Sequence, residues 1–200
     1  LFFDLENFIK FHNKFINMKG ITKLMADVDV NEYFDEYVDI GKFHKLCEEC
    51  ENYELNWSCP PFDFDIEEYW KTYERFKIIA FKVEFDEEEL SQTFTPPQLD
   101  LVLTRIERIK GRLMNDIYSQ EDEDSIGLYL GRCNLCMRCT REFGMPCKMP
   151  VKMRYSPESL GANIDRTIED FFDSKVVYAE NGKLPQYMFF VGGILYKKIK

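Results

Sequence analysis

Cysteine placement is the feature that most constrains this chain. All seven cysteines of its 200 residues lie in two short segments, "CEECENYELNWSCPPF" (47–62) and "GRCNLCMRCTREFGMPCKMP" (131–150). Isolated cysteines buried in a core have no reason to recur at intervals of three residues, as they do in the second segment. An odd count, in a chain without an export signal, also argues against a disulfide framework. The spacing predicts that the thiols converge on an inorganic centre when the chain folds.

The N-terminal segment does not have the pattern of a signal peptide. Its apolar stretch, "LFFDLENFIKFHNKFIN", is interrupted by Asp4, Glu6 and Lys10 and lacks a small-residue cleavage site. The apolar residues instead recur on one helical face, which predicts a helix over residues 1–19. No segment reaches the roughly 18 uncharged residues of a membrane span. We therefore expect a cytoplasmic protein, because thiols stay reduced in that compartment.

The run Cys133, Cys136 and Cys139 distinguishes between two metal chemistries. Structural zinc is usually held by two separate Cys-x-x-Cys turns, each of which provides two ligands. A consecutive C-x2-C-x2-C run instead wraps three corners of an iron–sulfur cubane, and a more distant cysteine supplies the fourth thiolate. The spacing therefore favours an iron–sulfur cluster (4Fe-4S), with zinc as the alternative cofactor.

Two cysteines are candidates for the fourth corner. Cys147 is nearest in sequence, whereas Cys59 is followed directly by proline, as is the remote cysteine of bacterial ferredoxins. If Cys147 completes the first site, Cys47, Cys50 and Cys59 remain as a separate triad with an open coordination position. His44 would complete a Cys3His zinc site on spacing alone, but we interpret it as a structural residue.

The rest of the chain predicts a single metal-binding domain over residues 1–200, of the α/β (α+β) class. We expect a mixed sheet flanked by helices, with two irregular cysteine-rich loops at its edge. The clearest helix begins after Thr95, a good N-cap, and ends before the acidic run "QEDEDS". A terminal hairpin is predicted over residues 175–198, because Asn181-Gly182 is a strong turn signal.

Composition and charge limit the partners. A hydrophobic content of 45% provides a core and argues against disorder. The formal net charge of -10 argues against nucleic acid and against an anionic membrane, because both would repel an acidic surface. The same surface favours a protein redox partner of basic character, and it leaves the oligomeric state open.

Together the two segments resemble the predicted metal-binding protein family (domain of unknown function DUF2284) over about residues 20–196. The family joins a C-x2-3-C…Y…W-[ST]-C-P-P element to a C-x2-C-x2-C…C-x-x-P element and a short P…G-I-D stretch. The matching residues here are Cys47, Cys50, Tyr53, Trp57, Ser58, Cys59, Pro60, Pro61, Cys133, Cys136, Cys139, Cys147, Pro150, Pro157, Gly161, Ile164 and Asp165. Glu54 stands where the family usually has glycine, and Ala162 and Asn163 separate Gly161 from Ile164. Neither departure affects a thiol, so the resemblance implies metal binding, and it implies no particular reaction.

Three functions stay open on these residues. A cysteine-ligated iron–sulfur protein in electron transfer or a redox accessory role agrees best with the spacing. The alternatives are a zinc-binding interaction module and a metalloenzyme that uses an open three-cysteine site. No catalytic residue is assigned, because the chain has two histidines and no nucleotide-binding or hydrolase motif. The candidate metal ligands are Cys133, Cys136, Cys139, Cys147, Cys47, Cys50 and Cys59.

Overall fold

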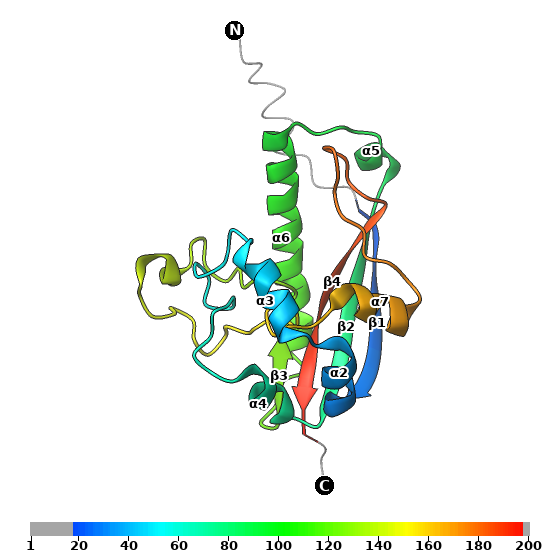
Figure 1. Ribbon diagram of the computed structural model, residues 1–200. Helices are drawn as coiled ribbons and strands as arrows, with labels where there is room; N and C mark the ends of the chain where they lie inside the picture. The colour runs from blue at the N-terminus through cyan, green and yellow to red at the C-terminus, as the bar shows by residue number, and fades with distance from the viewer. Residues whose placement is uncertain (1–17, 198–200) are drawn as a thin grey trace.

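A four-stranded sheet organises residues 18–197, the part of the chain that the computed structural model describes (Figure 1). The strands are β1 (Met18–Asp29), β2 (Arg75–Phe85), β3 (Ser125–Leu128) and β4 (Tyr187–Tyr196), in the order β1-β2-β4-β3. Each strand pairs with its neighbours in antiparallel orientation. The expected α+β class with a helix-flanked sheet is confirmed, and the sheet over the described residues is antiparallel instead of mixed.

Strand β2 carries apolar side chains to both faces of the sheet, which explains its continuous hydrophobic sequence. One face packs against helix α6 (Pro96–Tyr118), which has the helical period that the sequence predicts. Its N-terminus is capped as expected, because the Gln98 side chain accepts a hydrogen bond from the backbone N–H of Thr95 at 2.9 Å. The residues buried between β2 and α6 are Ile79, Phe81, Val83, Phe85, Val102, Ile106, Met114 and Ile117.

Three shorter helices cover the other face of the sheet (Figure 1). Two fully buried aromatic side chains anchor them and satisfy their own polar atoms. The Tyr33 hydroxyl shares a hydrogen bond of 2.8 Å with Thr167, and the Trp70 indole N–H donates to the Leu160 carbonyl at 3.0 Å. The helices are α2 (Val30–Tyr37), α4 (Ile66–Lys71) and α7 (Ile164–Phe172).

The prediction of a terminal hairpin over residues 175–198 is wrong. The turn itself forms, because Lys183 N–H donates to the Glu180 carbonyl at 2.9 Å across Asn181-Gly182. The segment before the turn makes no strand, and β4 pairs with β2 and β3 instead. A turn depends on local residues, whereas the partner of a strand depends on which sheet edge is free.

Other parts of the chain also differ from expectation. The helix predicted over residues 1–19 lies outside the described residues, except for its last two positions, which belong to β1. The first cysteine segment begins inside a helix, α3 (Ile40–Glu48), and not in an irregular loop. A short helix α5 (Glu87–Leu90) and a 3-10 helix η1 (Thr140–Phe143) complete the elements. Among residues 18–197, no helix has both the length and the apolar content that crossing a bilayer requires.

The short strand β3 determines where the cysteine segments lie. It pairs only with the last part of β4, from Gly193 to Tyr196. Residues 187–192 of β4 therefore have no strand on that side within the described part of the chain. Figure 1 shows the two cysteine segments on this side of the molecule, as irregular chain beside α6. The sheet thus leaves an open edge next to the thiols.

Gly193 lets β4 lie close to β2, because a Cβ atom at this position would be 2.2 Å from the Lys77 carbonyl oxygen. We expect Gly193→Ala to lower the free energy of unfolding by about 1–3 kcal/mol, since the strands must move apart to relieve the overlap. Urea denaturation measures the change. Gly20→Ala is the matched control, because nothing lies within 4 Å of the Cβ position there. Equal midpoints for the two variants would contradict this account of the pairing.

Candidate metal centre

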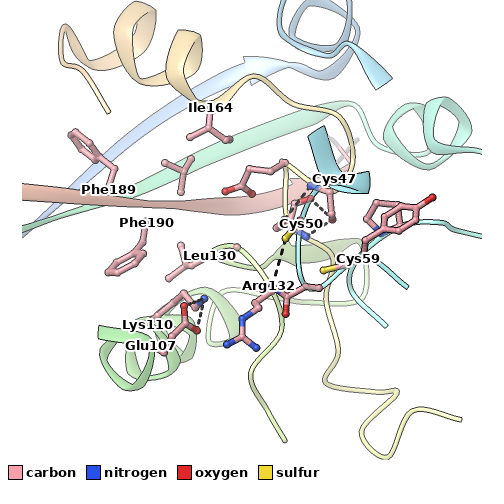
Figure 2. Close-up of a pocket in the computed structure, with 18 residues that line it drawn as sticks. Cys47, Cys50, Cys59, Glu107, Lys110, Leu130, Arg132, Ile164, Phe189 and Phe190 are labelled. Carbon is pink, nitrogen blue, oxygen red and sulfur yellow. Dashed lines mark hydrogen bonds and ion pairs between the residues drawn. The ribbon is translucent and has the colours of Figure 1, made fainter. Parts of the chain in front are cut away.

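The seven cysteines are free thiols, and they separate into two sets. The first set, the tetrad, lines a small cavity of about 20 Å³. The second set, the triad, lines a separate cavity of about 370 Å³, the triad cavity (Figure 2). The tetrad is Cys133, Cys136, Cys139 and Cys147, and the triad is Cys47, Cys50 and Cys59.

This division separates the two candidates for the fourth position beside the C-x2-C-x2-C run. Cys147 lies with the run, and Cys59 lies with the triad. Burial raises the pKa of the Cys133 thiol; the Leu135 backbone N–H opposes this shift, and the three other tetrad thiols add to it. Across residues 18–197, no three or more His, Cys, Asp or Glu side chains group closely enough to hold a single metal ion. The two sets are therefore defined by the cavities that they line.

The residues just before Cys59 hold the tetrad segment in place. The Ser58 hydroxyl accepts a hydrogen bond from Cys133 N–H at 2.8 Å, and the Asn56 side chain donates to the Cys133 carbonyl at 3.0 Å. Ser58 is fully buried, so this bond replaces one that water would otherwise supply. In the "WSCPP" element the serine thus supports the tetrad, whereas the cysteine belongs to the triad.

Backbone N–H groups point at the sulfur atoms of the tetrad. Trp57 N–H donates to Cys139 Sγ at 3.4 Å, and Met149 N–H donates to Cys147 Sγ, also at 3.4 Å. Such bonds stabilise negative charge on sulfur, and thiolate is the form that binds a metal. The chemistry of these donors therefore suits a thiolate-ligated iron–sulfur cluster or zinc ion, although the described thiols do not group closely enough to hold a single ion.

Arg141 clamps the two cysteine segments together, a role that the cysteine spacing gives no reason to expect. Its guanidinium donates to the carbonyl groups of Asn56 at 2.9 Å and Pro61 at 2.7 Å, and also to that of Cys59. The same group lies over the Trp57 ring, 5.2 Å from its centroid. One side chain from the tetrad segment therefore fixes three carbonyls of the triad segment.

The triad joins a helix end to an irregular loop. Cys47 lies on the last turn of α3, and Cys50 and Cys59 lie in the chain that follows. Burial raises the pKa of the Cys59 thiol to about 11, and the two other triad thiols add to this shift, whereas the Ser58 hydroxyl and Arg132 oppose it. A metal bound here would have to displace protons from these thiols.

His44 does not face the triad cavity. Its Nε2 lies 3.2 Å from the Ser159 carbonyl oxygen, an atom that only accepts, so Nε2 carries the proton and donates. The ring also contacts Phe62, with 6.2 Å between centroids. These contacts agree with the interpretation of His44 as a structural residue.

A buried lysine lines the triad cavity, and the cysteine spacing does not predict it. The Lys110 side chain is only 4% exposed, and its ammonium group donates to Glu107 Oε1 at 2.7 Å. Burial lowers the pKa of Lys110, and Glu107 opposes that shift. The sequence does contain a sign that Lys110 is buried, since this lysine falls in the apolar stripe of α6, four residues after Ile106.

Glu158 lines the same cavity from the turn before α7. Its Oε2 atom is buried and has no hydrogen-bond partner in the described structure. Burial raises the pKa of Glu158, while its own backbone N–H, the Ser156 hydroxyl and the charge of Lys110 partly oppose the shift. The folded protein therefore holds a carboxylate at a net cost in free energy.

Replacing Arg141 tests the clamp. We expect Arg141→Lys to lower the free energy of unfolding by about 1–3 kcal/mol, because a lysine cannot donate to three separated carbonyls. Metal should also leave this variant faster when a chelator is added. Arg138→Lys is the control, since Arg138 is 68% exposed and its ion pair with Glu142 lies at the surface. If both variants keep the wild-type stability and rate of metal release, Arg141 does not hold the segments together.

The unfavourable burial of the Glu158 carboxylate predicts that the stability of the protein depends on pH. The folded-state pKa lies above the usual value of 4.5, so ionisation of Glu158 destabilises the native protein as the pH rises above that value. Glu158→Gln cannot ionise, and we expect it to melt at a higher temperature than wild type at mildly alkaline pH. The difference should shrink as the pH falls towards 5, in melting curves recorded across this range. A difference that does not change with pH would show that Glu158 ionises freely.

Comparison with known proteins adds one result. Residues 35–196 match the family model described as "Predicted metal-binding protein (DUF2284)". This range includes both thiol sets and the strands β2, β3 and β4, and it begins after β1. No curated protein and no solved structure matches the chain. Since the match extends over most of its length, the chain belongs to this family of predicted metal-binding proteins.

Proposed function

We propose that this protein is an iron–sulfur protein, in which the tetrad binds a 4Fe-4S cluster and serves electron transfer or a redox accessory role. Membership of the family supports metal binding, and it does not identify the metal. The observation that carries the finer proposal is the tetrad itself, four thiols on one small cavity with backbone N–H groups directed at two of their sulfur atoms. Four thiolates are the usual ligand set of such a cluster.

The surroundings of the tetrad suit a redox centre. Apolar side chains of Leu135, Met149 and Met153 line its cavity together with Trp57. They would limit the access of water, and the N–H donors would tune the reduction potential of the sulfur ligands. When bound, the cluster would supply one-electron chemistry.

Local charge bears on the partner that such a centre would meet. Although the chain is acidic overall, residues 131–154 hold one acidic residue, Glu142, among several basic ones. A partner must come close to the tetrad to exchange electrons, and charges beyond about 10 Å are largely screened. We therefore favour an acidic docking surface on the redox partner, in place of the basic one that net charge suggests. The basic residues are Arg132, Arg138, Arg141, Lys148, Lys152 and Arg154.

The triad supports a second candidate function, that of a metalloenzyme. A metal held by three thiolates keeps a coordination position for a further ligand. The triad lines a cavity of about 370 Å³, which offers room for that ligand. This candidate does not compete with the first, because the two sets share no cysteine.

Metal analysis of anaerobically purified protein tests the proposal. We expect iron and acid-labile sulfide, with a broad visible absorbance that dithionite bleaches. Cys136→Ser should remove this absorbance and lower the melting temperature, because ligand loss and loss of folding energy are coupled. Cys50→Ser, the matched control in the triad, should keep the absorbance. A colourless wild-type protein with stoichiometric zinc would contradict the cluster and favour an interaction module.

A further inference from the structure

We propose that two copies of this chain pair through strand β1 and form a dimer with one continuous eight-stranded sheet. The two β1 strands would run antiparallel, with the two-fold axis at Met25, so that the stretch from Ile21 to Asp29 pairs with the same stretch of the second copy. This surface goes beyond the proposed function, since β1 ends before residue 35, where the match to the metal-binding family begins.

Strand β1 has a long free edge. Among residues 18–197, it pairs with β2 alone and stands at the end of the strand order β1-β2-β4-β3. Its 12 residues are about twice the length of an average strand. Alternate residues therefore present backbone N–H and C=O groups that no strand of the described chain satisfies, and such an edge is a template for a further strand.

The features that usually block an edge strand are few in β1. Prolines and bulges prevent the addition of a strand in many sheets, and β1 contains no proline. Its register with β2 shifts only near the start, between Met18 and Gly20, and is regular from Gly20 to Asp29. The regular stretch can therefore accept a strand along its whole length.

The order of charges along β1 favours a second copy in antiparallel orientation. The lysines lie in the first half of the strand and the aspartates in the second half. About an axis at Met25, Lys23 faces Asp27 of the second copy on both sides of the axis, and opposite charges that face each other stabilise paired strands. Within the chain, Lys23 pairs with Asp116 and Asp27 pairs with Arg75, both at the surface, so the contact across the axis would join these pairs into a network.

The apolar residues of β1 also suit this axis. Met25 is 59% exposed and Ile21 is 39% exposed, and both lie on one face of the strand because every second residue shares a face. Met25 would be covered by the same residue of the second copy. On the opposite face, the half-buried Leu24 and Ala26 would face each other across the axis. Pairing thus removes apolar surface from water on both faces, which favours association.

This dimer would leave the cysteine segments accessible. Figure 1 shows β1 on the side of the sheet away from these segments, which lie beyond β4 beside α6. In the dimer the two sets of thiols would therefore lie towards opposite ends of the eight-stranded sheet. Dimer formation and metal binding should be independent of each other.

Sedimentation velocity of the anaerobically purified full chain tests the proposal. We expect a mass twice that of one chain at micromolar concentration, and dissociation on dilution. A monomer throughout the micromolar range would overturn the dimer. Iron content of the same sample keeps the two proposals apart, because a dimer without iron would overturn the cluster and leave this interface standing.

Substitution of Met25 identifies the surface. Met25→Lys would place two ammonium groups opposite each other at the axis, so we expect the dissociation constant of the dimer to rise roughly tenfold or more. Leu46→Lys is the matched control, because Leu46 is 54% exposed and lies on α3. Melting curves check that both variants fold. A folded Met25→Lys variant that dimerises as tightly as wild type shows that β1 is not the interface.

Exchange of the two charges tests the register. Lys23→Asp would place carboxylates opposite each other, and we expect it to weaken the dimer. Adding Asp27→Lys to the same chain restores opposite charges across the axis, and this double variant should recover most of the lost affinity. A folded double variant that dimerises no better than Lys23→Asp alone overturns the pairing centred on Met25.

Discussion

Hydrogen bonds between the two cysteine segments are the constraint on which both thiol sets depend. Ser58 and Asn56 bind the backbone of Cys133, and Arg141 binds back to the carbonyls around Cys59. Neither segment has enough regular structure of its own to hold thiols in place, so each supplies the framework for the other. A metal that orders the tetrad should therefore also order the triad, because folding and metal binding draw on the same contacts.

Two polar groups whose burial is unfavourable line the triad cavity and not the cavity of the tetrad. A lysine in the apolar stripe of α6 and a glutamate with a buried, unpartnered oxygen both reduce stability, and an apolar residue at either position would be less costly. Local conflicts of this kind are concentrated at sites that bind or react. The tetrad is surrounded by apolar side chains and N–H donors, and the triad by charge and open volume. This contrast is the reason for assigning different roles to the two sets.

Sequence patterns predicted the elements that depend on local periodicity. The helix predicted to begin after Thr95 and to end before the acidic run corresponds to α6, which spans Pro96–Tyr118. The predicted hairpin failed, because its turn is a local feature and the pairing of β4 is not. Arg141 and Glu158 were missed for a similar reason. Their importance comes from contacts with residues that are distant in the sequence, and no local sequence pattern indicates these contacts.

The chain by itself predicted that its seven cysteines serve a metal, because cysteines that recur at intervals of three residues are not typical of a buried core. It also determined the α+β class and membership of a metal-binding family, since periodicity and motif spacing are written along the chain. Only the tertiary structure decided that Cys147 lies with the run and Cys59 with the triad. That choice depends on hydrogen bonds in which Arg141, Asn56 and Ser58 join residues more than seventy positions apart in the chain. It also depends on where β3 ends and leaves the edge of β4 open. Contacts between distant segments are set by packing and hydrogen bonding in three dimensions, which spacing along the chain does not encode.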